Sequence, residues 1–473
     1  MKLCLVLVTL AQWVWCSSAY HVLVVYPVPS RSHNILGKGV VDALMQAGHE
    51  VSKGECPKAV SFKKHILVPD VDMNDMRNVN KGMSFVREFG RNISTLAMQA
   101  KGLKEALVKG KYDAVITEHF FSDTDAGYAA VLQVPWIQVN SVTMQPNYEH
   151  QMDEVRTLST VPLYFNPSEI PMPFLNRLAP YYVGLIHTWR NVRSVVLSLY
   201  EKLFAPVAAA RGTTLPPFPD AYYNVSILFV NSHSSFASAM SLPPNVIEIG
   251  GYHIKEDVPP LPKDLQDLLD SSPQGVIYFS MGSVLKSANF PAVTKKELLK
   301  VLGELPYTVL WKFEEQLEGR PKNVHIRSWM PQASILGNPG FRVYTNHHCL
   351  ALLPISFGVG AVCFILPNIP ISRHISSHAL YPSFLCLMNK FINQSPKKLL
   401  AHYVELAIET KGAYHLRSKS LLYPWYQRWM LDQLALLLLL LTIVSIAICR
   451  ALRICSNKLW GTKTIKLKKA KKN

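Results

Sequence analysis

The chain has 473 residues, of which 49% are hydrophobic and 17% charged, so it is too long for one ordinary domain and predicts two. Its net charge of +17 is concentrated in residues 450–473, with nine lysines and arginines, and residues 319–404, with eight, and neither stretch has an acid. The remaining charges cancel, which leaves no basic face and excludes a nucleic-acid partner from the prediction.

The N-terminus has the pattern of a cleaved secretory signal at residues 1–19. Lys2 precedes an apolar run that ends at Trp15, and three small residues come before Tyr20. The alternative is an uncleaved anchor or a buried helix, although the run is shorter than the roughly 20 residues that a membrane span needs.

The next segment alternates between strand and helix patterns. The run "YHVLVVYPVPS" predicts a strand, and apolar residues at helical spacing then continue to a stop at Gly48. A second unit has strands at Ala114–Thr117 and Trp136–Val139 with a helix between them. This order predicts an α/β domain with a parallel, doubly wound, Rossmann-like sheet over residues 20–255.

A second α/β domain is predicted over residues 271–425, after a proline-rich linker at 256–270. The run "VIYFSMGSV" indicates a strand that enters a Gly-Ser loop, and "PAVTKKELLKVLGEL" a helix. Further strands are expected at "TVLWKF" and "NVHIRSW". Two such domains leave a cleft between them, where ligands usually bind.

An uncharged run near the C-terminus predicts a transmembrane helix at residues 431–449. The basic tail at 450–473 follows it, so the positive-inside rule places the tail in the cytosol and the large N-terminal portion in the lumen. Lys469 and Lys471 fit a dilysine retrieval pattern, and a merely solvated basic tail fits as well. We expect a single-pass type I protein of the endoplasmic reticulum membrane.

Seven segments in the right order give the chain a resemblance to the animal membrane-bound UDP-glycosyltransferases, or UDP-glucuronosyltransferases. They are "SRSHNILGKGVVDALMQAGHEVS", "LFVNSHSSF", "PPNVIEIGGYHIK", "VIYFSMGSV", "VLWKFE", "WMPQASIL" and "KGAYHLRSKSLLYPWYQRWMLDQLALLLLL". The resemblance implies a glycosyltransferase-B fold of two Rossmann-like domains. It also implies a hexosyltransferase of detoxification that moves a sugar from a UDP-sugar to a hydroxyl of a small lipophilic acceptor, with inversion.

The resemblance implies no metal and no cofactor, with the UDP-sugar as co-substrate. It also allows homo-oligomers, or hetero-oligomers with related transferases. Of the cysteines that remain in the lumenal part, none forms a CxxC pair or a zinc-like spacing.

Three residues are candidates for proton transfer. His33 matches the family's catalytic histidine, in the loop expected after the first strand, and an imidazole near neutral pKa can take the proton of an attacking hydroxyl. Glu118 matches the acid that orients this histidine, and Asp123 is a second candidate. A structural hydrogen bond for His33, and a helix cap for either acid, are the alternatives.

Four residues are candidates for donor binding. Ser283 lies in the Gly-Ser loop, Trp329 matches the uracil-stacking tryptophan, and Gln332 is a polar contact close to it. The diphosphate-binding histidine of the family corresponds to either Asn346 or His347. A tryptophan at a strand end is usually part of the core, so the stacking role depends on the resemblance.

The segment after Thr345 departs from the family. The glutamate for the ribose and the Asp-Gln pair for the sugar have no counterpart, and His348 replaces a glycine beside the phosphates. Two explanations stay open for residues 346–404: a degenerate donor site, or a reading frame disturbed and then restored. The alternative function is therefore a catalytically impaired family member that serves as a binding or partner subunit.

Overall fold

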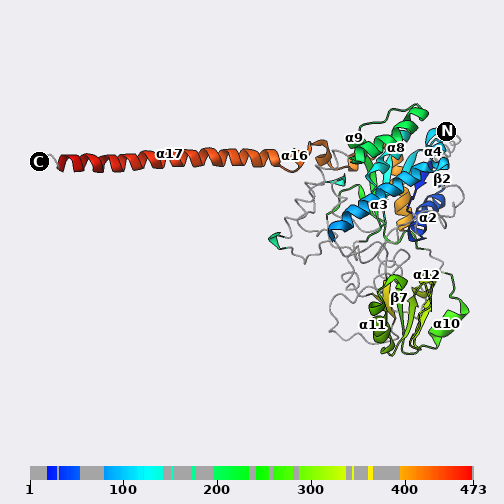
Figure 1. Ribbon diagram of the computed structural model, residues 1–473. Coiled ribbons are helices and arrows are strands. Elements are labelled where there is room, and N and C mark those ends of the chain that lie inside the picture. Colours follow the sequence, from blue (N-terminus) through cyan, green and yellow to red (C-terminus); the bar gives the residue numbers. More distant parts are fainter. Residues whose placement is uncertain are drawn as a thin grey trace, which may run out of the picture.

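The computed structural model describes residues 19–28, 31–53, 79–120, 122–141, 151–153, 173–175, 195–233, 241–254, 259–280, 287–336, 343–345, 361–365 and 395–470. The predicted signal at 1–19 lies almost entirely outside them. The described elements form two separate sheets with helices around each, and one long C-terminal helix (Figure 1).

The first sheet has six parallel strands in the order β2-β1-β3-β4-β5-β6. Their bounds are β1 His21–Val25, β2 Glu50–Lys53, β3 Ala114–Glu118, β4 Trp136–Asn140, β5 Val225–Val230 and β6 Val246–Glu248. The strands are short β-branched and aromatic runs that are buried throughout β3, β4 and β5, as both faces of a parallel sheet must be. The predicted strands at 114–117 and 136–139 are thus confirmed.

Helices cover both faces of this sheet. One face packs against α2 (Arg31–Gln46) and α15 (Pro396–Glu409). The other packs against a layer formed by α3 (Val79–Gln99), α4 (Lys101–Lys109), η2 (Asp123–Asp125), α5 (Ala126–Leu132), α8 (Val195–Arg211) and α9 (Phe218–Tyr222). Alternate residues of each strand supply the two cores, which is the period of two that a pleated strand imposes.

The second sheet has the order β10-β11-β7-β8-β9. Its elements are α10 Lys263–Asp270, β7 Val276–Ser280, η3 Ser287–Asn289, α11 Ala292–Gly303, β8 Thr308–Lys312, β9 Val324–Arg327, α12 Gln332–Leu336, β10 Val343–Thr345 and β11 Ala361–Ile365. Strands β7, β8 and β9 are the three expected from the sequence and are parallel. The α/β class with two Rossmann-like sheets is therefore confirmed.

Two details of the second sheet differ from the expectation. Strand β11 is antiparallel to both β7 and β10, so the sheet is mixed rather than wholly parallel. An antiparallel neighbour needs no crossover helix, which removes the constraint that a parallel strand would impose. Helix α10 occupies most of the second half of the predicted linker 256–270. Its residues Leu265 and Leu269 form an apolar stripe that packs on this sheet, which stabilises a helix there.

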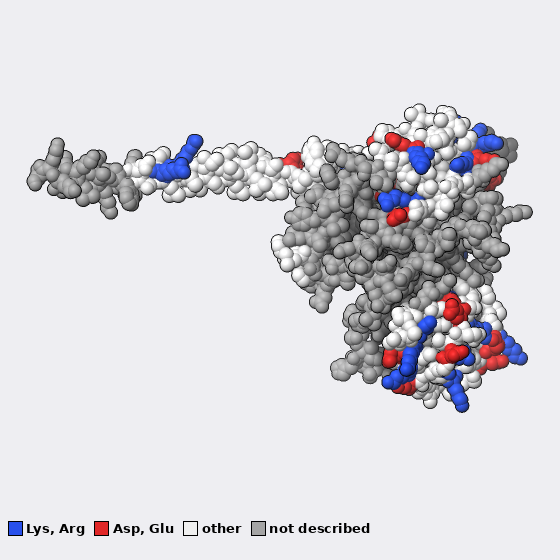
Figure 2. Space-filling view, in the orientation of Figure 1, with Lys and Arg blue, Asp and Glu red and all other residues white. Residues whose placement is uncertain are grey.

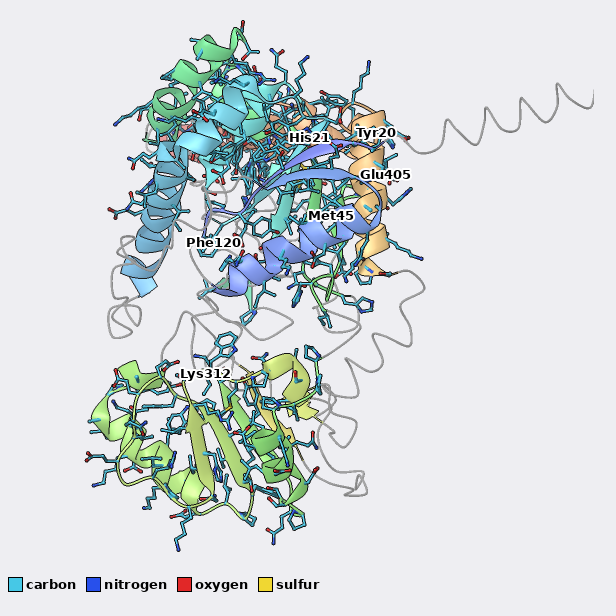
Figure 3. The ribbon with its side chains drawn as sticks, turned by 90° about the vertical axis from the view of Figure 1, so that its right-hand side faces the viewer. Tyr20, His21, Met45, Phe120, Lys312 and Glu405 are labelled. Carbon is cyan, nitrogen blue, oxygen red and sulfur yellow. The ribbon has the colours of Figure 1, made fainter. Side chains whose placement is uncertain are left out.

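Helix α15 follows the second sheet in the chain but packs on the first. Leu400, Val404 and Ala407 are fully buried in the core shared with α2. At the rim of this contact, the Nε2 atom of His49 lies 3.0 Å from the Oε1 atom of Glu405. Figure 3 shows Glu405 and Tyr20 on the same side of the first sheet. Residues 396–409 fall inside the segment 271–425 that the sequence assigns to the second domain, but their packing joins them to the first sheet.

The C-terminal part continues through η4 (Tyr414–Leu416), η5 (Lys419–Leu422) and α16 (Trp425–Arg428) into α17 (Leu431–Ala470). Within α17, Leu431–Asn457 is long and apolar enough to cross a membrane, judged by length and composition. The helix extends well past the predicted end of the span at 449, since lysine, arginine and leucine after it are good helix formers.

Both signs of charge lie side by side on the described surface of the two sheet-containing parts in the view of Figure 2. In the same view, most of the described part of α17 carries neither sign. In this view the candidate span therefore presents a largely uncharged surface.

Candidate active site

The first candidate site lies where parallel strands β1 and β3 end. Strand β1 lies between β2 and β3. The chain passes from β1 to β2 on one side, and the next strand, β3, pairs with β1 on the other side, so the strand order reverses at β1. In a doubly wound sheet, ligands bind outside the carboxyl ends of the strands at such a switch point. Residues that follow β1 and β3 are therefore placed together by topology.

His33 and Glu118 meet at this switch point. Glu118 is the last residue of β3, and its Oε1 atom is hydrogen-bonded to the Nδ1 atom of His33. Both side chains are buried, with His33 6% and Glu118 1% exposed. The Phe120 ring lies edge-on to the imidazole with ring centroids 5.0 Å apart, and Figure 3 shows Phe120 near the end of α2 that carries His33.

The position of His33 differs from the expectation in one respect. It was predicted in the loop after the first strand, but it is the third residue of α2. The helix begins at Arg31, four residues before Ile35, the first apolar residue of its pattern, so His33 lies in its first turn. A histidine in the first turn of a helix is held more rigidly than one in a loop.

The pair has a defined chemical capacity. A carboxylate that accepts the Nδ1–H bond fixes the tautomer, which leaves Nε2 as the atom able to accept a proton. The same carboxylate stabilises the imidazolium that forms. The Oγ atom of Ser141, which directly follows β4, donates a further hydrogen bond to Oε1 of Glu118.

Asp123, the second candidate acid, is the first residue of η2 and lies beyond the end of β3. The sequence prediction missed Asp125, which is 1% exposed. Its carboxylate accepts hydrogen bonds from Ser94 at 2.9 Å and from Ser122 at 2.6 Å. Burial raises the pKa of Asp125 to about 7, so this acid is partly protonated near neutral pH.

Replacing Asp125 by asparagine is expected to make the free energy of unfolding fall less as the pH rises from about 4 to 7. The folded chain holds a proton on Asp125 in this window while the unfolded chain has lost it, so ionisation costs stability as the pH rises. The free energy of unfolding of the variant should rise relative to that of the wild type by up to roughly 1.4 kcal/mol per pH unit across this window. Denaturant unfolding at several pH values measures the difference.

Two buried histidines act in the opposite direction. Burial lowers the pKa of His119 and of His253 to about 4, so both histidines contribute more to the free energy of unfolding as the pH rises. These contributions are the same in the wild type and in Asp125→Asn. The matched control is Asp220→Asn, because Asp220 is exposed on α9. Parallel pH curves for the wild type and Asp125→Asn would show that Asp125 ionises like a surface acid.

The donor side is described in part. Trp329 follows β9 and is 41% exposed, so it is a surface residue rather than the core residue of the alternative interpretation. Gln332 begins α12, and its Oε1 atom lies 3.4 Å from the Oη atom of Tyr278 on β7. Ser283 and His347 lie outside the described residues. Trp329 and Gln332 thus both follow the carboxyl end of β9, and Gln332 contacts Tyr278 of β7.

Among the described residues, no group of three or more His, Cys, Asp or Glu side chains is placed to hold a metal ion. The described part of the first site offers one histidine nitrogen, Nε2 of His33, that can accept a proton, and a carboxylate that holds the other ring nitrogen.

Comparison with known proteins shows which family the chain resembles. A family model described as UDP-glucoronosyl and UDP-glucosyl transferase matches residues 61–364 and 391–466. UDP-glucosyltransferase 2 of Dactylopius coccus is 26% identical over 89% of this chain and 90% of its own length. An ecdysteroid UDP-glucosyltransferase of Mamestra brassicae nuclear polyhedrosis virus is 24% identical over 69% of this chain and 67% of its own.

A solved structure, that of a spinosyn forosaminyltransferase, covers 68% of this chain and 72% of its own with 15% identity and a TM-score of 0.40. The family model covers well over half of the chain. Residues 365–390, within the stretch 319–404 that has no acid, lie between its two matched parts. The chain therefore belongs to the UDP-glucoronosyl and UDP-glucosyl transferase family and is a UDP-glycosyltransferase.

Proposed function

We propose that the chain transfers a sugar from a UDP-sugar to a hydroxyl of a small lipophilic acceptor. The observation that carries the proposal is the buried contact between His33 and Glu118 at the switch point of the first sheet. The name of the viral relative, an ecdysteroid UDP-glucosyltransferase, supports a lipophilic, hydroxylated acceptor. The donor side of the proposal rests on Ser283, Trp329, Gln332 and His347.

The proposed reaction is a single displacement. Nε2 of His33 takes the proton of the acceptor hydroxyl while its oxygen attacks the anomeric carbon. The bond from that carbon to the β-phosphate oxygen breaks, and UDP leaves with the electron pair. Because the acceptor oxygen attacks from the face opposite UDP, the anomeric configuration inverts. Glu118 stabilises the imidazolium, and the step needs no metal and no cofactor.

The test is a transfer assay with the full chain in microsomes, using tritiated UDP-sugars and a panel of hydroxylated lipophilic acceptors. We expect a product with inverted anomeric configuration, formed equally with and without EDTA. A product that requires a metal, or that retains the configuration, would contradict the mechanism. Acceptor binding without transfer from any donor would contradict the function and favour a binding or partner subunit.

We further propose that the chain is a type I protein of the endoplasmic reticulum membrane, with residues up to about 430 in the lumen. The support is the candidate span Leu431–Asn457 followed by a tail that is basic throughout. Protease added to sealed microsomes is expected to remove only the tail, a few kilodaltons. Protease with detergent is the control and should digest the whole chain, whereas digestion of the bulk in sealed vesicles would reverse the orientation.

A further inference from the structure

The carboxyl ends of β3, β4 and β5 are tied together by side chains that follow the strands. Ser141 donates from its Oγ atom to Glu118. Asn231, which follows β5, donates from Nδ2 to the carbonyl oxygen of Ser141 at 3.2 Å. The backbone N–H of Asn231 also donates to the carbonyl oxygen of Asn140 at 3.0 Å. A continuous chain of hydrogen bonds therefore runs from His33 to Asn231.

The other end of the Asn231 side chain reaches a turn after β6. Its Oδ1 atom accepts a hydrogen bond from the backbone N–H of Gly251 at 3.2 Å. Gly251 has a φ of +81°, which side chains rarely permit. A Cβ atom on Gly250 would lie 2.7 Å from the carbonyl oxygen of Ser232, so this position also excludes a side chain. The two glycines allow the turn to present its amide to Asn231.

The same turn contacts the helix that carries His33. A Cβ atom on Gly39 of α2 would lie 2.7 Å from the Cα atom of His253, so helix and turn touch through their backbones. Tyr252 is fully buried in the core beneath them. The contacts thus close a ring that passes through His33, Glu118, Ser141, Asn231, the turn at 250–253 and α2. The turn lies only a few residues before the proline-rich segment that leads to the second sheet.

We propose that Ser141 and Asn231 are positioning residues of the sugar transfer, an inference that rests on the proposed function. Ser141 fixes the carboxylate of Glu118 for His33, and Asn231 ties the backbone of Ser141 to the turn at Gly251. Because α2 rests on the same turn, a displacement of the turn moves both members of the His33–Glu118 pair. The geometry of proton transfer is in this way set at the start of the connection between the two sheets.

The experiment compares Ser141→Ala, Ser141→Thr and Asn231→Ala in the full chain. Ser141→Ala is expected to lower kcat by about 10- to 100-fold, the effect typical of residues that orient a reacting group, with little change in the KM for either substrate. Ser141→Thr keeps a hydroxyl and should recover most of the loss. A merely structural Ser141 would instead lower thermal stability and leave kcat unchanged.

Asn231→Ala is expected to lower kcat similarly and to speed hydrogen–deuterium exchange in the peptide that contains residues 249–254. The matched control is Asn323→Ala, which removes three hydrogen bonds from Nδ2 to carbonyl oxygens of Leu302, Leu305 and Tyr307 beside the second sheet. The control should change neither kcat nor exchange at 249–254.

The outcomes separate this inference from the proposed function. Wild-type transfer with unchanged kcat in Ser141→Ala and Asn231→Ala would overturn the positioning roles. If the wild type transfers no sugar, the proposed function fails, and exchange alone decides on the ring of contacts. In that case, equal exchange at 249–254 in Asn231→Ala and Asn323→Ala would overturn the ring as well.

Discussion

Replacing His33 by glutamine is expected to lower kcat by about a hundred- to ten-thousand-fold, the range that a general base contributes. Glutamine is polar and of similar size, so it can keep a hydrogen bond to Glu118, but it cannot accept the acceptor's proton at neutral pH. The KM for the UDP-sugar should change little, because the described candidates for donor binding, Trp329 and Gln332, follow strand β9 of the second sheet and not the strands that hold His33. Initial rates at saturating donor and acceptor measure the loss.

Two further variants make this result specific. Glu118→Gln should also lower kcat, and the double variant should be no slower than His33→Gln alone, because the two residues act as a unit. His49→Gln is the matched control, since His49 is also buried and paired with a glutamate, but with Glu405 on α15. Turnover by His33→Gln at the wild-type rate would remove His33 from the proposed mechanism.

The strands at the switch point could be predicted from sequence because buried parallel strands are continuous apolar runs. The segments of β1, β3 and β4 stand out as such runs between helical spacings. The alternation of strands with helices then predicts that they lie in one parallel sheet. His33 and Glu118 could then be paired, with the help of the family resemblance, before any contact was known.

The support around the pair could not be predicted in the same way. Ser141 and Asn231 are 90 residues apart in sequence. Asn231 lies in the segment "LFVNSHSSF", but nothing in that segment or around Ser141 indicates that the two residues share a site. What brings them together is the adjacency of β4 and β5, which only the tertiary structure fixes. A serine or asparagine directly after a buried strand is the one local signal, and it is equally typical of a turn.

Asp125 shows a related limit. The sequence "SDTDAG" reads as a polar helix start, where an exposed capping acid is the ordinary outcome. Its burial depends on α3, whose Ser94 supplies one of its two hydrogen bonds. Burial, to which this distant helix contributes, is the main cause of the raised pKa of Asp125, and the local sequence does not reveal it.

The choice of sheet by α15 is a third example. The pattern of Leu400, Val404 and Ala407 predicts an amphipathic helix but not the surface that it covers. Its position after β11 in the chain favours the second sheet, and packing places it on the first. Complementarity with α2 decides the outcome, and helix packing of this kind has no local signature.

Replacing Leu400 by alanine is expected to lower the free energy of unfolding of the first sheet and its helices by about 2–5 kcal/mol, the usual cost of a large-to-small change in a core. Leu400 is fully buried in the core between α15 and the first sheet, so the truncation leaves a cavity there. The loss should appear as faster hydrogen–deuterium exchange in α2 and as earlier unfolding in urea, measured by pulse proteolysis of the full chain in detergent.

The matched control is His402→Ala, on the same helix but exposed, which should change the urea midpoint very little. An equal loss of stability in both variants would indicate that α15 acts through its own helical stability and not through its contact with the first sheet. Helix α15 connects the second sheet, through η4, η5 and α16, to the candidate span. Its contact with α2 therefore also has a functional consequence. A chain that loses this contact keeps His33 and Glu118 but releases α2, and with it the helix that holds the histidine against its carboxylate.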